Sequence, residues 1–181
     1  MVKAMEHSVS TTVGTDIGDR LARLVAAFDA LDSAATHDPL PRFLHLAAIQ
    51  LAAVAHGDCA CFSRLYENAL VDSVTYDPRN NLVGGEAYLV ADYPATRTVL
   101  ATRTPAAAHV DDPGSDPAEV RLLREFGLSA VLLLPVVSSG YTWGLAEAYR
   151  EGPNRFRDED VAFAKLFVAH LGSLLLQFYE A

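Results

Sequence analysis

The segment that predicts the fold is Ser129-Ala-Val-Leu-Leu-Leu-Pro-Val-Val137, then Ser138-Ser139-Gly140, then Tyr141-Thr-Trp-Gly-Leu-Ala-Glu-Ala-Tyr-Arg150. Its first part is a continuous apolar run, which is typical of a strand buried on both faces. Its last part alternates between small and large side chains, as a strand with two different faces does. Gly140 suits the positive φ that short hairpin loops often need. We therefore expect two paired strands in a central antiparallel sheet.

The alternation within residues 141–150 predicts a different role for each face of this sheet. Small residues on one face would let helices approach closely, and these are Gly144, Ala146 and Ala148. Rings and a carboxylate on the other face indicate a cavity or solvent, and that face carries Tyr141, Trp143, Leu145, Glu147 and Tyr149. This division of the two faces is the basis of the other expectations.

Length and charge restrict the class of protein. A chain of 181 residues is typical of one domain. The net charge of −9, from 14 basic and 23 acidic residues, argues against binding to nucleic acid or to an anionic membrane. The polar N-terminus lacks the apolar core of a signal peptide, and no unbroken apolar run approaches the roughly 18 residues of a membrane helix. We expect a cytoplasmic protein with no nucleic-acid or membrane partner.

Residues 1–14 show no hydrophobic period and are predicted to be disordered, while residues 15–181 are predicted to form one domain that begins with a helix. That helix, at about residues 15–32, is indicated by apolar residues at helical spacing, namely Ile17, Leu21, Leu24, Phe28 and Leu31. The last helix, Asp158–Tyr179, is apolar over most of its circumference and needs a second packing partner. The first helix could be that partner, but we favour a second copy of the chain, in a homodimer through the terminal helices.

Three local features are interpreted as structural. Cys59 and Cys61 lie two residues apart on a predicted strand, which is too far for an unstrained disulfide, so they are expected to be small buried residues. Asp116 and Glu119 are expected to act as a capping pair for a helix that starts at Pro117. The acidic loop 111–116 lacks the ligand spacing of a calcium loop, and no metal site is expected.

Short sequences in a fixed order resemble the GAF domain family from about Leu40 to Leu176. They are His56–Cys61, Tyr93–Leu100 with Thr104-Pro105, Leu122–Gly127, Leu133–Val136, Trp143–Glu147 and Phe156–Asp160. The resemblance implies an α+β sandwich, GAF/PAS-like, with a six-stranded antiparallel sheet. The N- and C-terminal helices would cover one face, and short helices would roof a small-molecule pocket on the other.

The resemblance does not identify a ligand, because GAF domains serve many functions. Bilin attachment in the family uses a Cys in the middle region, and this chain has none after Cys61. Haem would have only His109 as a plausible axial ligand. In the cyclic-nucleotide branch an Asn-Lys pair stands where this chain has Tyr149-Arg150, and Val161 replaces the motif's Glu. Bilin, haem and cyclic nucleotides are therefore each disfavoured, and the cofactor stays unknown.

Six residues are candidates for the ligand site: Tyr93, Arg97, His109, Trp143, Glu147 and Tyr149. Arg97 could bind a carboxylate or phosphate, with a surface role as the alternative. His109 could donate to an anionic ligand or bond only to the backbone. Glu147 lies mid-strand among apolar neighbours, where a carboxylate needs a partner or water.

We therefore expect a non-catalytic regulatory domain that binds a small molecule and signals through its terminal helices, with output through a separate partner protein. Two alternatives stay open. One is an interaction module whose pocket is filled by its own side chains. The other is a small reductase, although the family's reductases bring cysteines to the pocket from separate segments and this chain has only one Cys-Ala-Cys.

Overall fold

A six-stranded antiparallel sheet lies at the centre of the computed structural model, which describes residues 2–80, 82 and 85–179, with side chains from residue 16 onward. The strands are β1 (Cys59–Tyr66), β2 (Ala69–Tyr76), β3 (Ala87–Leu89), β4 (Ala106–His109), β5 (Ala130–Ser138) and β6 (Tyr141–Arg150). Their order across the sheet is β3-β2-β1-β6-β5-β4. The predicted hairpin is β5 and β6. Ser139 and Gly140, with φ of 51° and 77°, form its two-residue loop, the positive-φ turn that matches strand twist.

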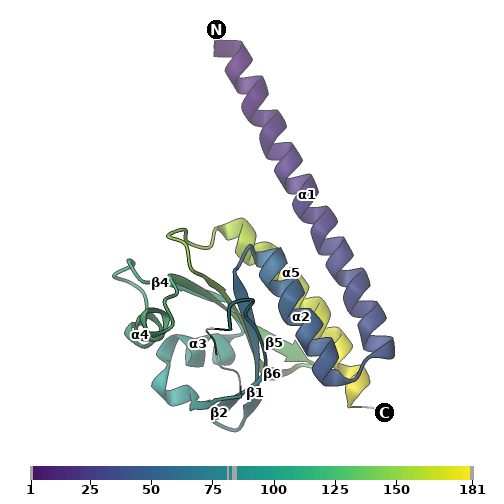
Figure 1. Ribbon diagram of the computed structural model, residues 1–181, viewed down its shortest axis with the longest axis vertical. Coiled ribbons are helices and arrows are strands. Elements are labelled where there is room, and N and C mark those ends of the chain that lie inside the picture. Colours follow the sequence, from purple (N-terminus) through teal and green to yellow (C-terminus); the bar gives the residue numbers. More distant parts are fainter. Residues whose placement is uncertain (1, 81, 83–84, 180–181) are drawn as a thin grey trace.

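Helices cover both faces of the sheet, as predicted for an α+β sandwich (Figure 1). On one face lie α1 (Val2–His37), α2 (Leu40–Ala55) and α5 (Asp158–Leu174), which continues as the 3-10 turn η2 (Leu175–Phe178). On the other face lie the 3-10 turn η1 (Val90–Asp92), α3 (Pro94–Thr102) and α4 (Pro117–Glu125). The long terminal helices and the short roof helices are therefore separated by the sheet.

Small residues bring the terminal helices close to the sheet. Ala146 and Ala148 are fully buried in the core that β6 shares with α2 and α5, as predicted for this face. Gly172 of α5 lies against β5, because a Cβ added there would overlap the carbonyl oxygen of Val137. The helix backbone thus packs almost directly on the strand backbone.

A β-bulge at Trp143 changes the face predicted for the start of β6. Val136 pairs with Gly144 and Val137 pairs with Thr142, so the β5 pairing skips Trp143. The Trp143 side chain packs in the helix-side core, and its Nε1 donates to the Tyr179 hydroxyl at 3.1 Å. The prediction that Trp143 shares a face with Glu147 is wrong, because a bulge shifts the alternation by one residue.

The bulge also changes the reason for Gly144. A Cβ at this position would overlap the carbonyl oxygen of Ser63 on the neighbouring strand β1. The glycine was predicted to make room for a helix. In the structure it allows two strand backbones to approach closely.

Residues 2–14, predicted to be disordered, continue α1 as a helix that extends past the rest of the domain (Figure 1). The packed part of α1 provides a nucleus, since Leu24, Ala27 and Leu31 are buried in the core. Once a helix is nucleated, each further residue adds a hydrogen bond at little cost. Residue 1 of the predicted disordered segment lies outside the described residues.

A buried ion cluster joins α1, β6 and α5. Asp160 is fully buried, and it accepts from Arg20 Nη2 at 2.7 Å and from Arg150 Nη2 at 2.9 Å. Arg150 also donates to the carbonyl oxygens of Ala55, His56 and Arg155, which fixes the end of α2. This cluster attaches the first helix to the body of the domain.

The span 158–178, formed by α5 and η2, contains an 18-residue window with a mean hydropathy of 1.6 and is long enough to cross a membrane by length and composition alone. One side of this span instead packs in the core of the domain, where Phe167, Leu171 and Leu175 are fully buried. This is typical of the core helix of a globular domain.

Candidate functional site

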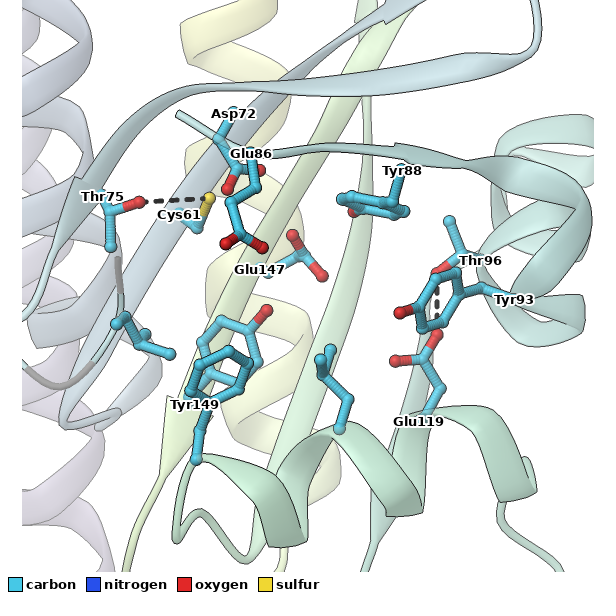
Figure 2. A pocket seen from close by; sticks show the side chains of 13 residues that line it. Cys61, Asp72, Thr75, Glu86, Tyr88, Tyr93, Thr96, Glu119, Glu147 and Tyr149 are labelled. Carbon is cyan, nitrogen blue, oxygen red and sulfur yellow. Dashed lines mark hydrogen bonds between the residues drawn. The ribbon is translucent and has the colours of Figure 1, made fainter. Parts of the chain in front are cut away.

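A pocket of about 90 Å³ lies between the sheet and the roof helices, on the face opposite the terminal helices (Figure 2). It is lined by Cys61, Asp72, Thr75, Leu82, Glu86, Tyr88, Tyr93, Thr96, Glu119, Leu122, Phe126, Glu147 and Tyr149. A water needs roughly 10–15 Å³ on this measure, so the pocket has room for roughly six to nine water-sized groups. It is smaller than the roughly 300–1,000 Å³ of pockets that hold drug-sized ligands.

The floor of the pocket is a row of direct cross-strand partners. Glu147 on β6 pairs with Cys61 on β1, and Cys61 pairs with Thr75 on β2. Two residues further along β1, Ser63 pairs with Asp72, and the Ser63 hydroxyl donates to the Asp72 carboxylate at 2.8 Å. Because paired residues share a face of the sheet, these side chains all point toward the roof.

The roof is held together by one aspartate that caps two helices. Asp116 accepts from the backbone of Ala118 at 2.8 Å in α4 and from the backbone of Ala95 at 2.6 Å in α3. Its capping role for α4 was predicted, but the role predicted for Glu119 was wrong. Glu119 points into the pocket and accepts from the Thr96 hydroxyl of α3 at 2.8 Å. The two roof helices are therefore connected directly above the floor.

The pocket is acidic. Four carboxyl groups line it, from Asp72, Glu86, Glu119 and Glu147, and no Lys, Arg or His does so within the described part of the chain. Burial, together with the nearby Glu119 and Asp72 charges, raises the pKa of Glu147 to about 8, although hydrogen bonds from the hydroxyls of Tyr149 and Tyr88 act to lower it. Burial also raises the pKa values of Asp72 and Glu119.

Three tyrosines complete the walls. Tyr88 and Tyr93 meet edge to face with ring centroids 5.1 Å apart. Burial and the nearby Glu147 raise the pKa values of Tyr88 and Tyr149 well above the ordinary value. Both hydroxyls therefore keep their protons and can donate to the Glu147 carboxylate.

Three of the six predicted site residues, Tyr93, Glu147 and Tyr149, come together in this pocket. Arg97 is exposed on α3 and lies at a separate depression on the surface, beside Leu65 and Glu67.

Two further predicted residues point elsewhere. His109 is buried at the end of β4, where its Nδ1 accepts from the backbone of Asp111 and its Nε2 lies 3.1 Å from the carbonyl oxygen of Pro153. Trp143 lies on the helix side of the sheet. Neither residue lines the pocket.

Sequence reasoning missed several pocket residues that carried a usable signal. Cys61 shares its predicted strand face with Cys59, but that face could not be related to Glu147 before β1 was known to pair with β6. Glu119, Leu122 and Phe126 have the spacing i, i+3, i+7 of one helix face, and all three line the pocket. Asp72, Glu86 and Tyr88 could not be assigned to the pocket from the sequence, because their position depends on the order of β2 and β3 in the sheet.

Metal binding has no support from the geometry. Within the described residues, no three His, Cys, Asp or Glu side chains are grouped closely enough to hold a metal ion. Cys59 and Cys61 are free and buried thiols on the pocket side of the sheet.

Known structures share this architecture. The chromophore-binding domain of the bacteriophytochrome RpBphP3 from R. palustris has a TM-score of 0.76 and 13% identity, and the alignment covers 90% of this chain and 63% of that one. A phycoerythrobilin-bound GAF domain from a cyanobacterial phytochrome has a TM-score of 0.76 and 12% identity, and the alignment covers 87% of this chain and 96% of that one. The chain thus spans less than two thirds of the bacteriophytochrome domain. At these identities the likeness concerns the fold.

A comparison with curated proteins found no match. The family model of the GAF domain, however, matches residues 39–175, which is most of the chain and includes every strand of the sheet and both roof helices. The sequence motifs, the layered sheet and this match agree, and the chain belongs to the GAF domain family.

Proposed function

We propose that this chain is a non-catalytic sensory domain that binds a small molecule beneath α3 and α4 and transmits binding to its terminal helices. The observation that carries the proposal is the pocket, lined by carboxyl groups and tyrosine rings, on the sheet face opposite those helices. Bilins occupy the cyanobacterial GAF domain of similar fold, so this fold can hold a ligand. The pocket here suits a much smaller molecule, and bilin is not proposed.

Strand β6 provides a physical route between the pocket and the helices. On one face its Glu147 and Tyr149 line the pocket. On the other side Trp143 binds Tyr179 after η2, and Arg150 binds Asp160 at the start of α5. A ligand that shifts β6 would therefore move both ends of the C-terminal helical segment.

The thiol chemistry supports a non-catalytic role. Burial, together with Glu147 and Asp72, raises the pKa of Cys61 well above the ordinary value. The Cys59 pKa is raised by burial to about 12. Thiols in this state are protonated and are weak nucleophiles.

We further propose a homodimer through an outer helix surface formed by Ile17, Leu21 and Val25 of α1 and Leu166 of α5. All four side chains are exposed by about half. They flank the α1–α5 contact, in which His170 of α5 lies against Phe28 and its Nε2–H donates to the Asp32 carboxylate. Exposed apolar residues at helical spacing are typical of helices that pack against a second copy.

Native mass spectrometry of the purified chain tests the ligand and the subunit count together. We expect a bound small molecule and a dimer. Protein with no bound molecule that also binds none from a cell metabolite extract would refute the sensory role.

A double variant, Leu21→Asp with Leu166→Asp, should be monomeric, because it places carboxylates on the outer helix surface. Ala26→Asp is the control for one added carboxylate, since Ala26 is exposed on the other side of α1. A double variant that remains a dimer in sedimentation would refute the interface. The cytoplasmic location and a separate output protein belong to the same proposal, and fractionation of cells followed by affinity capture would test them.

A further inference from the structure

We propose that the ligand of this pocket is a small organic cation that carries an ammonium group, held by Glu147 and its surrounding carboxyl groups and enclosed by tyrosine rings. The inference rests on the proposed function, because it names the class of ligand for that site.

The lining has one sign of charge. Carboxyl groups reach the cavity from β2 (Asp72), from the segment before β3 (Glu86), from α4 (Glu119) and from β6 (Glu147). Figure 2 shows Asp72, Glu86 and Glu147 close together at one end of the pocket, and Glu119 beside Thr96 and Tyr93 at the other. Among the described lining residues, no basic side chain balances them. An anionic ligand such as a carboxylate or phosphate would meet only repulsion here.

Glu147 is the residue that most requires a positive partner. Glu147 is only 4% exposed, and it lines the pocket. Its near neighbours are Cys61, Asp72, Glu119 and the hydroxyls of Tyr88 and Tyr149, none of which carries positive charge. A buried carboxylate is costly unless a cation or several donors compensate it. Elsewhere in this domain the buried carboxylate of Asp160 is paired with two arginines, whereas Glu147 has no basic partner among the described lining residues.

The walls of the pocket favour an organic cation. The faces and edges of Tyr88, Tyr93 and Tyr149 are suited to contact with an ammonium group, which is attracted to aromatic rings. Leu82, Leu122 and Phe126 offer an apolar surface for a short carbon chain. A bare metal ion is disfavoured, since the described acidic side chains do not converge as metal ligands.

Proton release gives the proposal a distinctive signature. The groups that face Glu147 are Cys61 of β1, Asp72 of β2, Glu86 and Tyr88 at β3, Tyr93 before α3, Glu119 of α4 and Tyr149 of β6. Because Glu147 is buried and none of these groups is positive, its pKa is raised to about 8 and it holds its proton at pH 7. An ammonium group beside it favours the carboxylate, so binding should release a proton. The binding constant should then rise by up to about tenfold per pH unit below pH 8.

The test uses the full chain and three probes of equal length: butylammonium, butanol and butyrate. Isothermal titration calorimetry at pH 8.5 should show butylammonium binding at least tenfold more tightly than either of the others. At pH 7, titrations in two buffers of different ionisation enthalpy should show proton release. The Glu147→Gln variant should bind butylammonium at least tenfold more weakly at pH 8.5 and should show no proton release at pH 7.

Glu125→Gln is the matched control, because Glu125 is exposed on the roof helix α4 and does not line the pocket. It should bind as the unmodified chain does. Tighter binding of butanol or butyrate would overturn the cation proposal and leave the proposed function intact. Equal binding of butylammonium by Glu147→Gln would also overturn it. No binding of any probe, together with no co-purified small molecule, would overturn both.

Discussion

Replacing Asp160 by Asn should destabilise the domain more than any other single loss of charge that the structure suggests. Asp160 is fully buried at the start of α5, where its two oxygens accept from Arg20, Arg150 and the backbone N–H of Arg157 at 2.7, 2.9 and 2.8 Å. Asparagine keeps the shape but offers one acceptor and one donor group. At least one arginine would then face an N–H group in place of a carboxylate oxygen.

The magnitude follows from what is left unpaired. Arg20 and Arg150 are 4% and 9% exposed, and two nitrogens of Arg20, Nε and Nη1, already have no hydrogen-bond partner within the described residues. Removal of one partner from a buried ion pair costs about 3–5 kcal/mol, because the remaining charge stays buried. We expect a loss of that size for Asp160→Asn. Asp32→Asn is the control, because Asp32 is half exposed in its pair with His170, where about 0–1 kcal/mol is expected.

Urea unfolding followed by circular dichroism at pH 7 would measure both variants. The same measurement at falling pH adds a second check. Burial acts to raise the Asp160 pKa, but hydrogen bonds from Arg157, Arg20 and Arg150 lower it overall. The stability that this group contributes is therefore present above its ordinary pKa of 3.8 and is lost as pH falls through the lowered value. The two proteins should converge in that range. A loss below about 1 kcal/mol at pH 7, or an equal loss for Asp32→Asn, would refute the reasoning.

Two other substitutions test the close packing and the acidic pocket. Gly172→Ala places a Cβ onto the carbonyl oxygen of Val137 and should lower the free energy of unfolding by about 1–3 kcal/mol. Gly18→Ala, in open space on α1, should instead stabilise the helix by about 0.5–1 kcal/mol. Equal thermal stability of the two variants would contradict the close contact at Gly172. Glu147 has its pKa raised from 4.5 to about 8, so its contribution to stability is present below pH 4.5 and is lost as pH rises through about 8. The Glu147→Gln variant should therefore become more stable relative to the unmodified chain as pH rises from 5 to 9. The gain should reach up to roughly 5 kcal/mol, at about 1.4 kcal/mol per pKa unit. A stability difference that does not change with pH in denaturant titrations would show that Glu147 is ionised in the folded protein.

Much of the fold could be predicted from local sequence because it depends on local chemistry. The hairpin of β5 and β6 follows from an apolar run, an alternating run and the Ser139-Gly140 turn between them. The helix α4 follows from Asp116 as its cap and Pro117 as its first residue. Burial of Ala146 and Ala148 under the helices follows from strand alternation alone. In each case the signal lies within a few residues of the element that it predicts.

The pocket could be predicted only in part, because it is assembled from residues distant in sequence. Glu147 and Tyr149 share a strand, so their common face was visible in the sequence. Trp143 lies on that strand too, but the bulge depends on how β5 pairs with β6, which no pattern within β6 reveals.

The sequence by itself determined the layered architecture and the presence of a carboxylate on the face away from the long helices, because periodicity and turn chemistry act within one element. The family followed from the order of its short motifs. Only the tertiary structure decided that Asp72, Glu86 and Glu119 join Glu147 around one cavity and that Arg97 and His109 do not. The physical reason is that strand order and helix placement set distances between segments, and the electrostatic cost of a buried charge depends on those distances.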